Sequence, residues 1–161
     1  MTRCIYPHLM VRMHLCFLLK CWRTKYRDKV VLVTLSGTWC PNCADEVEFL
    51  STYYRENQGR GLEIVTLLYE RYDAFEPAAR QGRALQAKHG IDVDILIAGI
   101  SDKTMASETL PMLSRVLAFP TMIFIDRKGN VRKIHTGFFG PGTGQHYTHL
   151  QLPTPTDQMR Q

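Results

Sequence analysis

Residues 30–50 read VVLVTLSGTWCPNCADEVEFL, and they join a hydrophobic run to a helical stretch through a pair of cysteines. The run over residues 30–35 is rich in β-branched side chains, which is typical of a strand buried on both faces of a sheet. A tight turn follows, and helical periodicity then continues to about Asn57. The segment therefore predicts a strand, a turn and a helix, with Cys40 and Cys43 at the beginning of the helix.

The place of Cys40 at a helix N-terminus favours a reactive thiolate. Free backbone N–H groups and the helix dipole stabilise negative charge there, which lowers the pKa of a thiol. Pro41 suits the first turn because no N–H is needed at that position. Cys43 shares one helical face with Val47 and Leu50, so we expect it to point inward while Cys40 sits at an exposed tip. One acidic thiol beside a shielded one is what a dithiol catalyst requires, the first attacking a disulfide and the second resolving it.

The rest of the chain alternates predicted strands and helices. We expect strands over residues 62–69, 93–98, 121–126 and 131–136, and helices over 74–89 and 103–117, the second limited or kinked by Pro111. The last two strands flank Arg127–Asn130, a glycine-containing turn typical of a β-hairpin. This order predicts an α/β protein with a central mixed β-sheet flanked by helices.

Composition and charge narrow the class of protein. The chain has 161 residues, with 45% hydrophobic and 22% charged, as in a single soluble globular domain. The net charge is +5, and it comes from the first thirty residues, which hold seven basic side chains and one acidic side chain. The remainder of the chain holds 13 basic and 14 acidic side chains. Nucleic-acid binding requires clustered positive charge, and the nearly neutral body therefore predicts no nucleic-acid partner.

The chain divides into three predicted parts. Residues 1–28 form an atypical basic segment, for which three interpretations stay open: a degraded export signal, an amphipathic basic anchor, or an uncertain start codon. Its hydrophobic stretch, residues 9–19, is too short to span a bilayer, so membrane association is expected through this segment alone. Residues 29–150 form the α/β domain, and residues 151–161 are a frayed tail.

The segment from Val30 to Leu50 resembles the active site of the thioredoxin-like superfamily, and most closely the TlpA/ResA-type (redoxin) thiol–disulfide oxidoreductases of bacterial envelopes. Trp39-Cys40-x-x-Cys43 carries the resemblance, which extends over residues 29–144. It implies a thioredoxin fold with a helix–strand insertion over residues 75–99. It also implies a disulfide-containing protein substrate, an electron-donor redox protein and no bound cofactor or metal. The cell envelope or periplasm is the implied location, with the cytoplasm still open, and reduction is the expected direction.

The resemblance also assigns roles near the cysteines. Phe119-Pro120-Thr121 matches the cis-proline element of the family, which lies against the CxxC motif and offers backbone groups to the substrate chain. Trp39 is expected on the surface of the active site, with a place in the core as the alternative.

Glu46 completes the candidate site, and Thr34 and Glu70 are two further positions near it in the predicted fold. Relatives carry an acidic residue at the position of Glu46, where it is thought to tune the cysteines and shuttle protons; a carboxylate that complements the helix dipole is the alternative. Thr34 stands where ordinary thioredoxins keep a buried acid, which favours the TlpA-type branch. Glu70 ends a predicted strand, and we expect it to be solvated, with a place at the same end of the sheet as the cysteines as the alternative.

Other functions remain as alternatives. A peroxiredoxin-type peroxidase would need Thr and Pro at the positions of Gly37 and Val33, so this class is disfavoured. A non-catalytic or zinc-binding module would need Cys16 and Cys21 as further ligands. The cysteines could also be inert core residues.

The chain departs from the family pattern in two places. Residues 1–28 do not resemble the N-terminal hairpin of the family, and the stretch from residue 146 is short for its closing helix.

Overall fold

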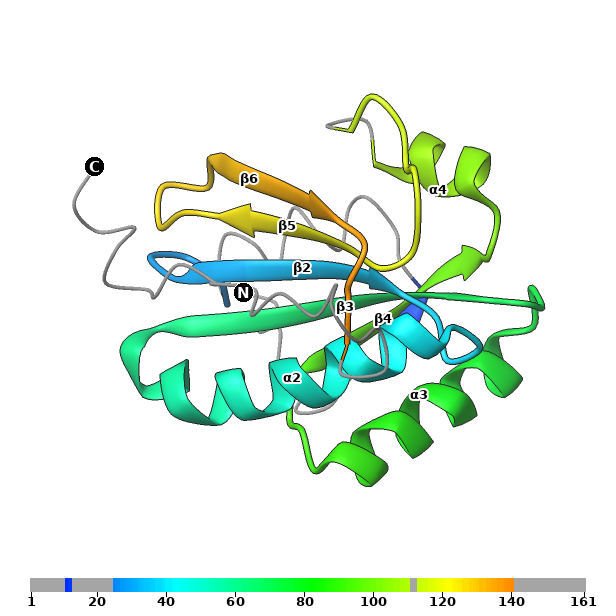
Figure 1. Ribbon diagram of the computed structural model, residues 1–161, viewed down its shortest axis with the longest axis horizontal. Coiled ribbons are helices and arrows are strands. Elements are labelled where there is room, and N and C mark those ends of the chain that lie inside the picture. Colours follow the sequence, from blue (N-terminus) through cyan, green and yellow to red (C-terminus); the bar gives the residue numbers. More distant parts are fainter. Residues whose placement is uncertain (1–10, 13–24, 111–112, 141–161) are drawn as a thin grey trace, which may run out of the picture.

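The computed structural model of the protein describes residues 11–12, 25–110 and 113–140 (Figure 1). Within these residues one sheet has the strand order β1-β4-β3-β2-β5-β6. Its strands are β1 (Val11–Arg12), β2 (Val30–Ser36), β3 (Leu62–Glu70), β4 (Asp94–Ile100), β5 (Thr121–Ile125) and β6 (Val131–Thr136). The helices are α2 (Pro41–Asn57), the short 3₁₀ turn η1 (Gln58–Arg60), α3 (Phe75–His89) and α4 (Lys103–Thr109).

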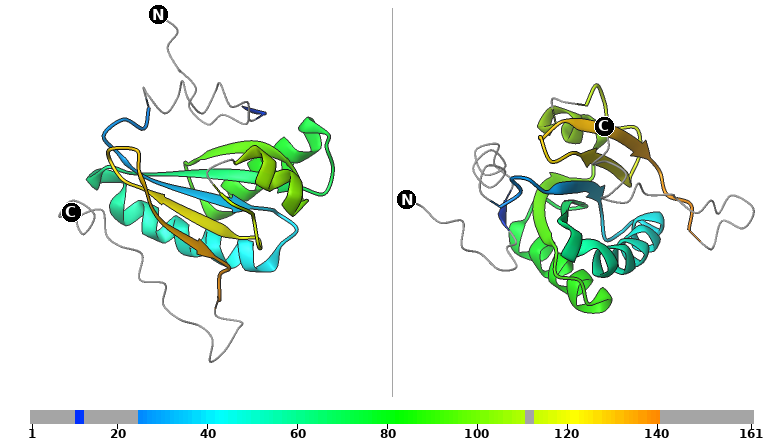
Figure 2. Two further views of the ribbon diagram at one scale, coloured as in Figure 1. Left: turned by 90° about the horizontal axis from the view of Figure 1, so that it is seen from above. Right: turned by 90° about the vertical axis from the view of Figure 1, so that its left-hand side faces the viewer.

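The sheet is mixed, as predicted. β1, β4, β3 and β2 run parallel to one another, whereas β5 is antiparallel to β2 and β6 is antiparallel to β5. β2 is buried along its whole length because helices cover both of its faces. Figure 2 shows α2 and α3 on one face and α4 on the other. The predicted α/β class is therefore confirmed.

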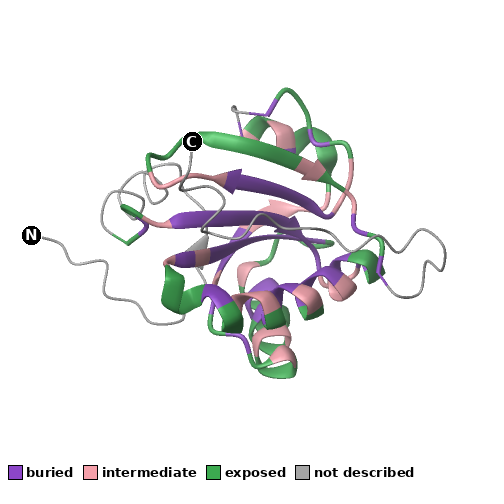
Figure 3. Ribbon diagram, turned by 60° about the vertical axis from the view of Figure 1, so that its left-hand side comes forward, coloured by how far each residue is buried: buried purple, intermediate pink, exposed green. Residues whose placement is uncertain are grey.

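Alternation along β2 divides the core between the two faces. Val30 and Leu32 pack with residues of α2 and α3, while Val31, Val33 and Leu35 pack on the side of α4. This is the two-residue period of a strand, seen here on a strand with no polar face. Figure 3 shows that burial decreases across the sheet, from the buried β2 to the exposed edge strand β6.

The helix–strand insertion consists of α3 and β4, which lie between β3 and α4 in the chain. The helix predicted to extend to Leu117 is too long, since α4 ends at Thr109. Leu110 has φ −128° and ψ 73°, outside the helical region. A proline disfavours helical geometry in the residue before it, and Pro111 therefore ends the helix rather than kinking it.

The predicted hairpin is present as β5 and β6. The turn between them is closed by the Asp126 carboxylate, whose Oδ1 accepts hydrogen bonds from the backbone N–H groups of Lys128 and Asn130, each at 2.9 Å. Gly129 has φ 85°, a conformation that favours glycine. The hairpin places the residues before Thr121 at the end of the sheet where β2 meets α2 (Figure 1).

Residues before β2 also contact the body of the protein. Tyr26 is buried, and its hydroxyl donates to the Asp94 carboxylate, which Lys25 Nζ also contacts at 2.5 Å. The packed body thus includes residues 25–29, while the three-part division of the chain stays a prediction. The predicted closing stretch from residue 146 and the tail over 151–161 lie outside the described residues. In the part of the chain that the structure describes, no helix has both the length and the hydrophobicity needed to cross a membrane.

Candidate active site

The two cysteines lie at the turn between β2 and α2, as predicted. Cys40 is the N-cap of α2, with φ −101° and ψ 115°, and Pro41 occupies the first turn. The backbone N–H of Cys43 donates to Cys40 Sγ at 3.3 Å, so the sulfur takes the place of the usual capping oxygen. Both cysteines are free thiols. The cap places one sulfur directly at the positive end of the helix dipole.

Burial of the two thiols differs from the prediction in one respect. Cys43 points inward, with 1% of its surface exposed, but Cys40 is only 6% exposed and does not sit at an exposed tip. The loop before β5 covers it, since the carbonyl oxygen of Phe119 lies 3.7 Å from Cys40 Sγ. The flanking Pro41 and Asn42 are exposed, so the thiol lies just beneath the surface.

The pKa values of the two thiols are displaced in opposite directions. The pKa of Cys40 is lowered to about 7, first by the hydrogen bond from the Cys43 side chain and then by backbone N–H groups of Cys43 and Asn42, against the opposing effect of burial. The pKa of Cys43 is raised far above its ordinary value by the same side-chain hydrogen bond, by burial and by the charges of Cys40 and Glu46. At neutral pH Cys40 is therefore about half ionised to the thiolate, while Cys43 stays a thiol.

Glu46 lies beneath the cysteines on the inner side of α2. Its side chain is fully buried, and burial raises its pKa to about 8. The Thr34 hydroxyl donates to Glu46 Oε2 at 2.6 Å, while Oε1 has no hydrogen-bond partner among the described residues. Because burial raises its pKa to about 8, the Glu46 carboxyl group is mostly neutral at pH 7, and the dipole alternative, which needs a charged carboxylate, is disfavoured.

Trp39 is half-buried and is anchored to the end of β3. Its Nε1 donates to the carbonyl oxygen of Tyr69 at 2.9 Å. Gly37 lies so close to the indole that a Cβ would meet Trp39 Nε1 at 2.4 Å, which explains why a residue without a side chain stands there. The indole also packs edge-on against Phe119, with ring centroids 5.9 Å apart. Trp39 therefore holds the loop before Cys40 against the loop before β5.

The residues of the cis-proline element lie beside Cys40. The peptide bond between Phe119 and Pro120 is cis, and the carbonyl oxygen of Pro120 accepts from Gly137 N at 2.8 Å. Thr121 begins β5 opposite Leu35 of β2 and is buried. The structure thus brings Phe119 and Pro120 next to the thiol, whereas Thr121 supports the loop from within the sheet.

Glu70 is buried at the active-site end of the sheet, so the favoured prediction of a solvated side chain is wrong and the alternative place is the one observed. It is 1% exposed, and its Oε1 accepts a hydrogen bond at 2.9 Å from the backbone N–H of Thr38. The signal for this alternative is its position at the carboxyl end of a buried parallel strand, because such ends meet the loop that carries the active cysteines. The pairing of Thr34 with Glu46 was missed too, since the two residues belong to different elements.

Metal binding has no support among the side chains that the structure places. The described ranges 11–12, 25–110 and 113–140 contain no cluster of three His, Cys, Asp or Glu side chains able to hold an ion. Cys16 and Cys21, the further ligands of the zinc alternative, lie outside those ranges.

Known proteins resemble this chain in sequence. The thiol-disulfide oxidoreductase ResA of Geobacillus thermodenitrificans (strain NG80-2) is 29% identical over 114 residues, covering 71% of this chain and 58% of that protein. The protein of the same name from Halalkalibacterium halodurans is 28% identical over 109 residues, covering 68% and 54%. The chain therefore spans a little more than half the length of these curated relatives.

Solved structures resemble it in fold. A secreted thiol-disulfide isomerase from Corynebacterium glutamicum matches with a TM-score of 0.59 at 17% identity, covering 73% of this chain and 67% of the other. A thiol:disulfide interchange protein of the thioredoxin family from Chlorobium tepidum TLS matches with a TM-score of 0.58 at 19% identity, covering 71% and 74%. These matches confirm the predicted thioredoxin fold.

A protein-family model matches most of the chain, and this match identifies its family. A family model described as redoxin matches residues 23–148, which include the whole of the site described above. The curated relatives are thiol-disulfide oxidoreductases, and they agree with that match. The chain belongs to the redoxin family.

Proposed function

We propose that the protein is a thiol–disulfide oxidoreductase that reduces protein disulfides through Cys40 and Cys43. The observation that carries the proposal is the cap of α2, where a thiol with a pKa of about 7 lies next to a second thiol whose pKa is raised. Thiolate is the nucleophile in disulfide exchange, and a thiol with a pKa close to ambient pH attacks best. The names of the sequence relatives support the same activity.

The proposed reaction transfers two electrons from the dithiol to the substrate. The Cys40 thiolate attacks one sulfur of a substrate disulfide, forms a mixed disulfide and expels the other substrate sulfur as a thiolate. Cys43 then loses its proton and attacks Cys40 Sγ, which expels the second substrate thiolate and leaves an intramolecular disulfide. Both substrate sulfurs finish as thiols after taking up protons, and the protein is the species oxidised.

Glu46 is proposed to take the proton that Cys43 must lose. It lies on the same helix, one turn after Cys43, and its charge acts on that thiol. Its own pKa of about 8 allows it to hold or release a proton near neutral pH. Phe119 and Pro120 are proposed to shape the surface on which the substrate chain docks, since the Phe119 carbonyl already lies next to the reactive sulfur.

The proposed partners are a disulfide-containing protein substrate and a redox protein that returns the dithiol to its reduced form. The reaction balance requires the second partner, because every turnover leaves Cys40 and Cys43 oxidised. We place the protein in the bacterial cell envelope, and its likeness in fold to the C. glutamicum isomerase, which is described as secreted, supports this location.

The test is the reduction of insulin by the purified protein with dithiothreitol as the electron source. Cys40→Ser should abolish the catalysed rate. In a separate incubation with insulin after dithiothreitol has been removed, Cys43→Ser should accumulate mixed disulfides, seen as mass increases that added dithiothreitol reverses. The matched control replaces Cys4, Cys16 and Cys21 together by Ser and should keep the rate. Full activity of the Cys40→Ser variant would exclude the proposal.

A further inference from the structure

Thr34 lies in the centre of the sheet, directly under the helix that carries the cysteines. It is the fifth residue of β2, and its side chain has no exposed surface. Its cross-strand neighbours are Thr66 of β3 and Met122 of β5, neither of which titrates. Apart from Thr66 and Glu46, the side chains around it on this face are mostly aliphatic, among them Leu32 and Val47. A hydroxyl in such a place needs a partner, since burying it unpaired is costly.

The partner of Thr34 is Glu46, and the bond between them is asymmetric. The Thr34 hydroxyl donates to Glu46 Oε2 at 2.6 Å, which fixes one oxygen of the carboxyl group against the sheet. Oε1 is buried without a hydrogen-bond partner among the residues that the structure describes. A carboxyl group held at one oxygen has its other oxygen available to carry a proton. β2 therefore orients the carboxyl group through one side chain.

The charged groups that act on Glu46 belong to the active site itself. Cys40 raises the pKa of Glu46, and Glu46 in turn raises the pKa of Cys43. On α2 the neighbouring acidic residues are Asp45, which is half-buried, and Glu48, which is exposed. The bond from Thr34 opposes burial by favouring the ionised carboxylate, and it lowers the pKa of Glu46.

We infer that Thr34 is the positioning residue of the proton acceptor: its hydroxyl holds Glu46 Oε2 so that the carboxyl group can take the proton of Cys43 during release of the substrate. This inference rests on the proposed function and adds to it a residue of the sheet whose hydroxyl is bonded to Glu46. Thr34 acts through Glu46 and takes no part in the attack by Cys40.

The test compares Thr34→Val, which keeps the shape but removes the hydroxyl, with Thr34→Ser, which keeps the hydroxyl. The measurement is the titration of the Glu46 carboxyl carbon by NMR in protein labelled at glutamate, assigned by its loss in a Glu46→Gln sample. Thr34→Val should raise the midpoint by about one pH unit, the size expected for one lost hydrogen bond to a charged group. Thr34→Ser should stay within about 0.3 unit, since the bond is kept.

A kinetic measurement separates this inference from the proposed function. In the Thr34→Val protein, release of a substrate from its mixed disulfide with Cys40 should slow by about three- to tenfold at pH 7, because the fraction of ionised Glu46 falls. Alkylation of Cys40 by iodoacetamide above pH 8 should change less than about twofold, since its attack does not use Thr34. An unchanged Glu46 titration in Thr34→Val, or an equal shift in Thr34→Ser, would overturn the role of Thr34. The Cys40→Ser result would still decide the proposed function by itself.

Discussion

Cys40 illustrates at the scale of one residue which properties of the site are local. Its place before Pro41, at the beginning of a helix, follows from the sequence, and so does the lowering of its pKa by backbone N–H groups. Its burial does not follow, because the atom that covers it is the carbonyl oxygen of Phe119, 79 residues further along the chain. Exposure depends on how distant segments meet in space, and a local pattern contains no measure of that.

Glu46 provides a prediction about stability and pH. Its pKa is about 8 in the folded protein and 4.5 in its ordinary state, so between these values the folded protein holds a proton that the unfolded chain has lost. Stability from this residue is therefore complete below pH 4.5 and is lost as pH rises through 8, at up to about 1.4 kcal/mol per pH unit. Glu46→Gln should remove this loss.

The measurement is urea denaturation of the wild-type protein and the Glu46→Gln variant at pH 4.5 and at pH 8. The free energy of unfolding of the wild-type protein should fall relative to that of the variant by a few kcal/mol between the two conditions. Cys40 titrates in both proteins and has the opposite sign, so its contribution largely cancels in the difference. Parallel pH profiles for the two proteins would contradict the buried, protonated state of Glu46.

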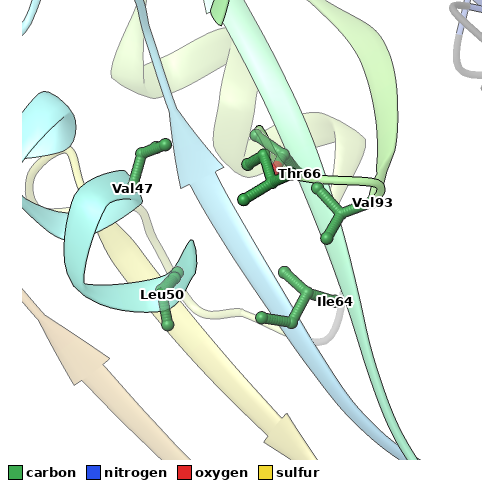
Figure 4. A pocket seen from close by; sticks show the side chains of 6 residues that line it. Val47, Leu50, Ile64, Thr66 and Val93 are labelled. Carbon is green, nitrogen blue, oxygen red and sulfur yellow. The ribbon is translucent and has the colours of Figure 1, made fainter. Parts of the chain in front are cut away.

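At the scale of elements, α2 joins the active site to the core through its inner face. A small cavity lies between this helix and β3, lined by Val47, Leu50, Ile64, Thr66, Ile91 and Val93 (Figure 4). Leu50→Ala should enlarge the cavity and lower the free energy of unfolding by about 3–5 kcal/mol, the upper part of the range for this change. The reason is that space already present beside Leu50 adds to the volume left empty.

The control for Leu50→Ala is Glu48→Ala on the exposed side of the same helix. Glu48→Ala should change the free energy of unfolding by less than about 0.5 kcal/mol. Chemical denaturation of the two variants at pH 7 makes the comparison. A loss below about 2 kcal/mol for Leu50→Ala would show that the helix closes over the space, and the cavity would then be no weak point of the core.

The elements also show why some bounds were predicted well and others were not. β2 is a continuous hydrophobic run, α2 and α3 have a helical period, and all three have clear ends, so the prediction matched their bounds to within a residue or two. α4 was predicted eight residues too long, since a hydrophobic pattern continues beyond Thr109 while the backbone restriction of Pro111 acts against it. Glu70 was misplaced for a different reason: burial at a strand end is decided by the loop that crosses it, here at Thr38.

At the scale of the whole molecule, one sheet supports two hydrophobic cores. The first includes Leu32 and Ile95 and faces α2 and α3, while the second includes Val33 and Ile123 and faces α4. Neither core is continuous with the other except through the backbone of the shared strands. Because β2 and β3 contribute side chains to both cores, loss of either face removes the support of the other, and the body should unfold as one cooperative unit.

Two conservative variants on opposite faces test this unity. Ile95→Val removes a methylene from the core under α2 and α3, and Ile123→Val removes one from the core under α4. Each should lower the free energy of unfolding by about 0.5–1.5 kcal/mol, and the double variant by the sum of the two within about 0.5 kcal/mol, because the residues share no partner. Urea transitions of all three variants, followed by circular dichroism and by fluorescence, should coincide. If Ile95→Val instead separated the two signals into different transitions, the faces would be independent units, and the active site would depend on the stability of the α2 side alone.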